Sequence, residues 1–126
     1  MQLNSDPPGR GKHAHRNAAR PLPVGEQSLE HAARLFRALG EPSRLRLLAL
    51  LAQGPLCVSE VAVIENESIS TISQRLRVLR AERLVTRARQ GKHILYALAD
   101  QHVADLVSSA LAHASEAQIR AAAPGR

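Results

Sequence analysis

Two histidines and two carboxylates near the C-terminus have types and a spacing that suit metal binding. They are Asp100, His102, His113 and Glu116, arranged as D-x-H-x10-H-x2-E. Imidazole nitrogens and carboxylate oxygens are ligands that zinc accepts in closed tetrahedral sites. A helix cap and a solvated helix face would use the same residue types, so the pattern leaves both interpretations open.

One helix must position these side chains. Apolar residues recur at helical spacing from Asp100 to Glu116 with no Gly or Pro between them, and Asp100 suits the N-cap. Eleven residues at about 100° each bring His113 within roughly 20° of His102, but about 16 Å further along the axis. One chain cannot close the site. A second, antiparallel copy would place Asp100 and His102 opposite His113 and Glu116 of the partner subunit, twice in a C2 dimer.

A second polar pattern lies on the helix predicted over residues 70–81. Its buried stripe is Ile69, Ile72, Leu76 and Leu79, and the opposite side carries Ser, Thr, Gln and Arg in place of Glu and Lys. Such side chains can hydrogen-bond to base edges in the major groove of DNA. Thr71 and Gln74 could also form a capping box. The DNA-binding residues predicted here are Ser70, Thr71, Ser73, Gln74, Arg75 and Arg77.

A β-hairpin is predicted directly after this helix. Residues 84–89 and 92–98 flank Gln90-Gly91, a Gly-containing turn between two apolar-rich segments. Basic side chains crowd its tip, where they could contact phosphates or be solvated. The predicted contacts are Arg87, Arg89, Lys92 and His93.

The rest of the chain supplies the framework. A helix capped by Ser28 presents Leu29, Ala32, Phe36 and Leu39 on one face and ends at Gly40. The next begins at Pro42 and stops at Gly54-Pro55, and a short helix covers residues 58–64. We expect three parts: a flexible arm over residues 1–25, a winged-helix domain that binds DNA and dimerises over 26–120, and a disordered tail over 121–126.

Composition narrows the class of protein. The net charge is +6, with 17 Lys and Arg against 11 Asp and Glu, which favours a polyanion such as nucleic acid as partner. With one cysteine, Cys57, an internal disulfide is excluded. The N-terminus has no signal-peptide pattern, and the apolar segments are too interrupted to span a bilayer. We expect a cytoplasmic, soluble protein with no membrane partner.

Several segments resemble the ArsR/SmtB family of small metal-sensing repressors over residues 29–116. They are RALGEPSRLRLLALLAQGPLCVSEV, STISQRLRVLRAERLV, RQGKHILYAL and the terminal D-x-H-x10-H-x2-E. The resemblance implies a mainly α winged helix-turn-helix with a small β-hairpin, homodimeric through its first and last helices. It also implies operator DNA bound by the metal-free dimer and released when metal binds.

The same resemblance implies functional residues. Asp100, His102, His113 and Glu116 match the site of the zinc-sensing branch, while Ser70, Ser73 and Gln74 match DNA-reading positions. In relatives that sense cobalt or nickel, the ends of the chain add ligands, which leaves a role open for His13 and His15.

The chain departs from the family pattern in two places. Thiophilic sensors carry a cysteine pair where this chain has Cys57-Val58-Ser59 with one thiol, so a cadmium site would need Cys57, Glu60 and an arm histidine. The turn over residues 65–68, before the helix predicted over residues 70–81, lacks the Gly that is common there in the family.

Three rival functions remain open. They are a winged-helix regulator with a vestigial metal site, a metal carrier that binds no DNA, and a metalloenzyme. All four ligands would be used in the zinc site, which leaves no open position for catalytic water. We therefore expect no enzyme activity.

Overall fold

The computed structural model describes residues 20, 21 and 23–122. Contacts between residues divide the chain into two units, Met1–His31 and Ala32–Arg126. Helix α2 (Glu26–Leu39) begins in the first unit and ends in the second, and all other described elements belong to the second. His13 and His15 lie outside the described residues, as does most of the predicted tail.

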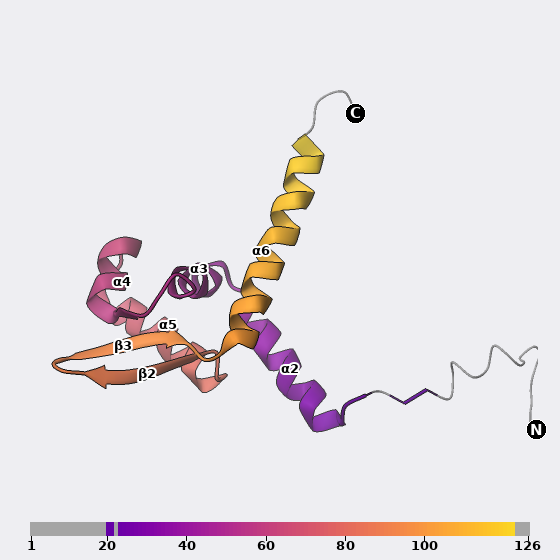
Figure 1. Cartoon of the computed structure of the whole chain (residues 1–126), viewed down its shortest axis with the longest axis horizontal. Helices are drawn as coiled ribbons and strands as arrows, with labels where there is room; N and C mark the ends of the chain where they lie inside the picture. Colours follow the sequence, from indigo (N-terminus) through magenta and orange to yellow (C-terminus); the bar gives the residue numbers. More distant parts are fainter. Residues whose placement is uncertain (1–19, 22, 123–126) are drawn as a thin grey trace, which may run out of the picture. The chain divides into compact units, whose positions relative to one another are not determined.

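The second unit is mainly helical and contains a β-hairpin, in the predicted order (Figure 1). After α2 come α3 (Pro42–Leu51), β1 (Leu56–Cys57), α4 (Val58–Glu65), α5 (Ile69–Ala81), β2 (Val85–Gln90), β3 (His93–Leu98) and α6 (Gln101–Ala122). The hairpin of β2 and β3 extends beside α4 and α5, and both helices contact it. This arrangement is that of a winged helix-turn-helix, with α4 and α5 as the helix pair.

Aliphatic side chains from every part of this unit form the core. Helix α3 packs against α5 and α6, and Leu48 is completely buried. The largest fully buried side chains are Leu47, Leu48, Val61, Ile72, Leu76, Leu79, Leu84 and Val107. These fully buried side chains are all aliphatic, and the half-buried Tyr96 packs against them.

The sheet has three strands in the order β1-β3-β2, all antiparallel. Strand β1 pairs Leu56 with Tyr96 and Cys57 with Leu95. The sequence does not predict this strand, because two residues carry no periodic pattern. In the hairpin, Gly91 adopts φ +64°, a left-handed conformation that glycine reaches without steric cost. The predicted hairpin is confirmed.

Two local predictions are wrong. Helix α2 begins at Glu26, so Ser28 lies inside it and is not its cap. Ile69, predicted in the buried stripe of α5, is 53% exposed because it is the first residue of the helix, beyond the reach of the core.

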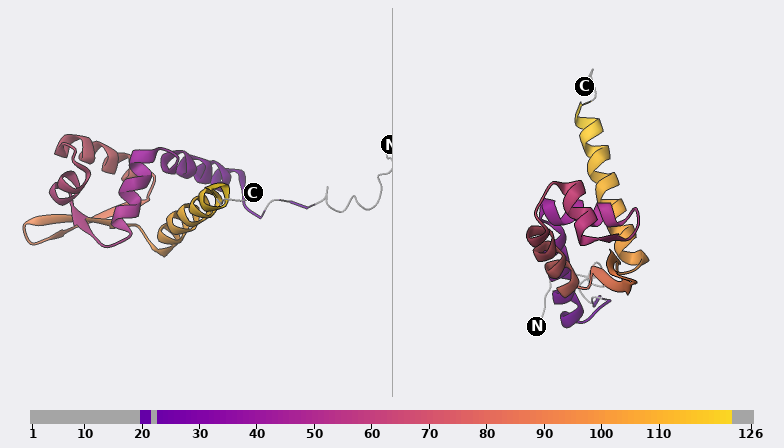
Figure 2. Two further views of the ribbon diagram at one scale, coloured as in Figure 1. Left: turned by 90° about the horizontal axis from the view of Figure 1, so that it is seen from above. Right: turned by 90° about the vertical axis from the view of Figure 1, so that its left-hand side faces the viewer.

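Helix α6 is longer than predicted. It continues to Ala122, two residues into the segment predicted as a tail. Its first half packs on the core through Val103 and Val107. Its second half extends away from α3, α4 and α5 in Figures 1 and 2, and every residue of 108–122 is exposed.

Candidate functional site

Helix α5 begins with a well-formed cap. Ser68 is the N-cap, and its hydroxyl oxygen accepts a hydrogen bond from the amide of Thr71 at 3.0 Å. The alternative interpretation of Thr71 and Gln74 as a capping box is therefore excluded, because Ser68 is the N-cap and Thr71 lies in the first turn. The amides of that turn point toward the end of the helix where a groove would receive it.

The turn before α5 is closed without the usual glycine. Asn66 ends α4 with φ 55° and ψ 50°, the left-handed conformation that glycine or asparagine commonly adopts at a helix C-terminus. The amide of Glu67 donates to the carbonyl of Ala62 at 3.0 Å, which satisfies one of the last carbonyls of α4. Asn66 thus replaces glycine at this position.

The outer side of α5 presents polar groups. Ser70, Gln74 and Arg77 are exposed, Thr71 and Ser73 are half-buried, and Ile72, Leu76 and Leu79 are buried on the other side. The Gln74 amide oxygen accepts a hydrogen bond from Arg77 Nη1 at 3.2 Å. Glutamine and arginine held side by side in this way can reach adjacent base edges.

Arg75 differs from the other predicted DNA contacts. Its side chain is 20% exposed, and Nη2 lies 3.4 Å from a carboxylate oxygen of Glu67. The structure thus places Arg75 against the turn between α4 and α5, away from the outer side of the helix.

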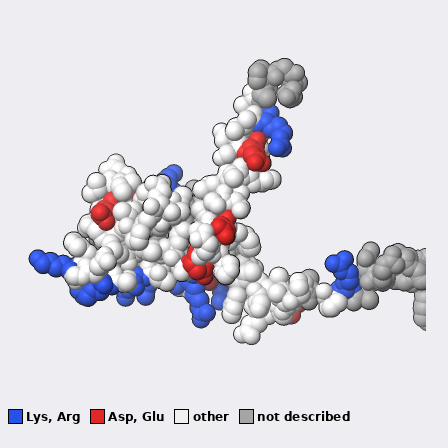
Figure 3. All heavy atoms as spheres, in the orientation of Figure 1, with Lys and Arg blue, Asp and Glu red and all other residues white. Residues whose placement is uncertain are grey.

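The hairpin carries the other basic residues. Arg87 and Arg89 are exposed on β2, and Lys92 and His93 are exposed beside the turn at Gly91. Figure 3 shows Lys and Arg gathered along the edge where β2, β3 and α5 lie in Figure 1. Residues 75–92 contain seven Lys or Arg and one acidic residue, Glu82. This edge is a cationic surface suited to DNA phosphates.

The predicted metal ligands fall into two groups along α6. Asp100 is confirmed as the cap of this helix, since its Oδ1 accepts from the amide of Val103 at 3.0 Å. The same oxygen lies 3.7 Å from Nδ1 of His102, whose side chain is 97% exposed. His113 and Glu116 are exposed three residues apart on the projecting half of the helix.

A single chain does not bring the two groups together. His102 and His113 share one side of α6 but lie about 16 Å apart along it, at 1.5 Å per residue. Within residues 20, 21 and 23–122, no three His, Cys, Asp or Glu side chains gather in a way that could hold a metal ion.

Cys57 and Glu60 use their polar groups locally. The Cys57 amide donates to Glu60 Oε1 at 2.9 Å, and this hydrogen bond lowers the pKa of Glu60. The Cys57 sulfur lies 3.2 Å from the hydroxyl oxygen of Ser59. Glu60 therefore closes the first turn of α4, and the arm histidines predicted to join this pair lie outside the described residues.

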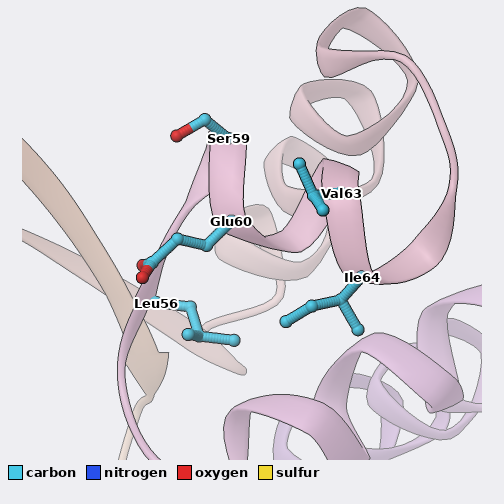
Figure 4. Close-up of a pocket in the computed structure, with 5 residues that line it drawn as sticks. All are labelled: Leu56, Ser59, Glu60, Val63 and Ile64. Atoms are coloured by element: carbon cyan, nitrogen blue, oxygen red, sulfur yellow. The ribbon is translucent and has the colours of Figure 1, made fainter.

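A shallow pocket of about 390 Å³, not anticipated from the sequence, lies on β1 and α4 (Figure 4). Leu56, Ser59, Glu60, Val63 and Ile64 line it, and Val63 is 81% exposed. Apart from the Glu60 carboxylate and the Ser59 hydroxyl its lining is apolar.

Across the described residues, no helix is both long and apolar enough to cross a membrane.

Comparison with known proteins identifies the family. Residues 41–87 match the model of the bacterial regulatory proteins of the arsR family. A transcriptional repressor SmtB homolog from Synechocystis is 40% identical over 105 residues, which cover 81% of this chain and 80% of that protein. The chain belongs to the ArsR/SmtB family.

Two further relatives extend the comparison. A cadmium resistance transcriptional regulatory protein CadC homolog from Staphylococcus aureus is 34% identical over 94 residues, 74% of this chain and 78% of that protein. The homodimeric winged helix-turn-helix DNA-binding domain from Mycobacterium bovis is similar in structure, with a TM-score of 0.67 and 30% identity over 84% of this chain and 90% of that one. The predicted family and winged-helix fold are confirmed. ArsR/SmtB proteins are transcriptional regulators, so the prediction that this chain is not an enzyme is also confirmed.

Proposed function

We propose that this ArsR/SmtB chain is a zinc-responsive repressor that binds operator DNA as a metal-free homodimer and releases it when zinc binds between the two copies of α6. The observation that carries the proposal is the division of the four candidate ligands between the start of α6 and its exposed second half. Asp100 and His102 lie at the start of α6, and His113 and Glu116 lie on its projecting half.

The donor set fits zinc. Two imidazole nitrogens and two carboxylate oxygens complete a tetrahedral shell without water. The imidazole of His102 is almost fully exposed, and Asp100 keeps one carboxylate oxygen outside its cap hydrogen bond. Bound zinc would supply a fixed link between two copies of α6, with Asp100 and His102 from one copy and His113 and Glu116 of the partner subunit as ligands.

Exposed apolar surface on two helices supports a dimer. Phe36 on α2 is 58% exposed, and Leu111 and Ile119 on α6 are 38% and 71% exposed. A second copy of the chain that covers these side chains would remove apolar area from water, which is favourable. The homodimeric domain from Mycobacterium bovis has the same fold.

A short hydrogen-bonded link joins the proposed ligands to the DNA-reading helix. The amide of Leu84 donates to the carbonyl of Leu79 in α5, and the carbonyl of Leu84 accepts from the amide of Ala99. Ala99 immediately precedes Asp100. A change in the position of the first turn of α6 would therefore be transmitted to the end of α5.

Release of DNA requires that zinc bind the free dimer more tightly than the DNA-bound dimer. A coupling of about 1–3 kcal/mol, the usual range, corresponds to roughly 5–150-fold weaker DNA binding. By reciprocity, DNA should weaken zinc binding by the same factor.

Subunit mixing tests where the site lies. Homodimers of His102→Ala and of His113→Ala should each lose both zinc sites. In the mixed dimer, the unchanged His102 of one chain and the unchanged His113 of the other complete one site. Zinc titration should therefore find one tight site per mixed dimer and none in either homodimer. Absence of a tight site from the mixed dimer would contradict ligation across subunits.

Cobalt, nickel and cadmium are the alternative metals. The cadmium resistance relative favours a comparison with cadmium in particular. Titration of the unchanged chain and of Cys57→Ala with each metal, followed by DNA release, ranks the metals. If DNA release by metal depends on Cys57 and not on His113, the sensing site would be a thiolate site at Cys57 and not a zinc site on α6. A chain that binds DNA but responds to none of the metals would have a vestigial site.

A further inference from the structure

Arg75 lies on the DNA-reading helix but does not face outward with its neighbours. At about 100° per residue, it lies roughly 160° around α5 from Arg77, beside the buried stripe of Ile72 and Leu79. Its side chain is 20% exposed, whereas Gln74 and Arg77 are exposed. A guanidinium in this position is directed toward the protein.

The nearer partner of Arg75 is a carboxylate in the turn before α5. Arg75 Nη2 lies 3.4 Å from Glu67 Oε2. The backbone of Glu67 is itself held, because its amide donates to Ala62 in α4 at 3.0 Å. The ion pair therefore connects the second turn of α5 to the C-terminus of α4, the two helices of the helix-turn-helix.

The charge of Arg75 also affects the pKa of a second carboxylate, that of Glu41. Glu41 caps α3 by accepting from the amide of Arg44 at 3.0 Å. That hydrogen bond is the main cause of a lowered pKa for Glu41, and the positive charge of Arg75 also contributes. Arg44 also joins the start of α3 to the end of α2, since its Nε donates to the carbonyl of Ala38 at 2.8 Å.

We propose that Arg75 is a positioning residue for DNA binding, which fixes the angle of α5 against Glu67 in the turn after α4 and makes no contact with DNA. The geometry that carries this is the inward direction of Arg75 and its ion pair with Glu67. The role is independent of the metal and of the site on α6, and it replaces the DNA contact expected for Arg75 from sequence.

The clearest test changes the partner and leaves Arg75 in place. Glu67→Gln removes one negative charge from a DNA-binding protein, which by electrostatics alone should tighten binding to any duplex. If Arg75 positions α5 through Glu67, the same substitution should weaken binding severalfold. The probe is a duplex enriched from random sequences by repeated binding to the metal-free chain, in the presence of a chelator. Tighter or unchanged binding would overturn the proposal.

Salt dependence separates positioning from phosphate contact. Arg77→Ala, the outward-facing control on the same helix, should reduce the slope of log affinity against log salt concentration by about 1. Arg75→Ala should weaken binding severalfold with the slope unchanged, because no phosphate contact is lost. A slope reduced by about 1 in Arg75→Ala would show that Arg75 contacts DNA, and would overturn the proposal.

A charge exchange covers the case in which Arg75→Ala does not fold. Arg75→Glu combined with Glu67→Arg keeps the net charge and restores an ion pair of the opposite orientation. Affinity for the enriched duplex should recover to within a few-fold of the unchanged chain, whereas Arg75→Glu alone should bind poorly. A double variant no better than Arg75→Glu alone would argue for a direct DNA contact at position 75. Circular dichroism and thermal melting confirm that each variant is folded.

Discussion

Oδ1 of Asp100 lies 3.7 Å from Nδ1 of His102 while it accepts the hydrogen bond from the Val103 amide that caps α6. One carboxylate thus has a structural role and belongs to the proposed metal site. Its second oxygen is free of the cap hydrogen bond, so ligation and capping need not compete. The two roles can be separated by substitution.

Asp100→Asn should retain the cap and lose the ligand charge, because asparagine is as good an N-cap as aspartate. We expect an unchanged melting temperature and weaker zinc binding. Asp100→Ala should lose both functions, with a stability loss of about 1 kcal/mol. Thermal melting and zinc titration of both variants provide the measurement. Equal zinc affinity in Asp100→Asn and the unchanged chain would remove Asp100 from the ligand set.

Gln74→Ala should relax DNA sequence preference, since its side chain lies on the outer side of α5 and can pair with one base. We expect a loss of about 1–3 kcal/mol on the preferred duplex and little loss on a duplex with that base pair changed. Arg89→Ala on the hairpin is the matched control. It should weaken binding to both duplexes alike, because phosphate contacts carry no direct sequence information. Competition binding with the two duplexes measures both effects.

Leu48→Ala should destabilise the fold by about 2–5 kcal/mol, because it removes a completely buried side chain between α3 and its neighbours. Val63→Ala, at a position that is 81% exposed, should change stability by less than about 0.5 kcal/mol. Denaturant unfolding at fixed protein concentration measures both, since dimerisation would make stability depend on concentration. A small effect of Leu48→Ala would contradict the packing described for α3.

Glu41→Gln should lower the melting temperature near neutral pH. The hydrogen bond from the Arg44 amide lowers the pKa of Glu41 below its ordinary value of 4.5. Its ionised form therefore stabilises the fold above about pH 4.5, and this contribution disappears as pH falls through the lowered pKa. The difference in melting temperature between Glu41→Gln and the unchanged chain should shrink on acidification from pH 7 to pH 3. A difference independent of pH would mean that the ionised cap is not the cause.

Local patterns in the sequence determine most of the order of helices and hairpin. Pro42 begins α3, Gly91 forms the hairpin turn and Asp100 caps α6 because each depends on residues a few positions apart. The positions of the candidate ligands along α6 can be predicted from the sequence for the same reason. In a helix each residue adds a fixed rotation and a fixed rise, so residue spacing gives the relative positions of the side chains.

Contacts between distant segments are decided by the tertiary structure. The exposure of Phe36 and Ile69, the short strand β1 and the inward direction of Arg75 all depend on where other elements lie. Periodicity identifies the apolar or polar side of a helix, but it does not say which neighbour covers that side. Arg75 and Arg77 are the same residue type on one helix. Only the ion pair with Glu67, in the turn before α5, holds one of them against the protein while the other is exposed, because an ion pair requires two segments to meet in space.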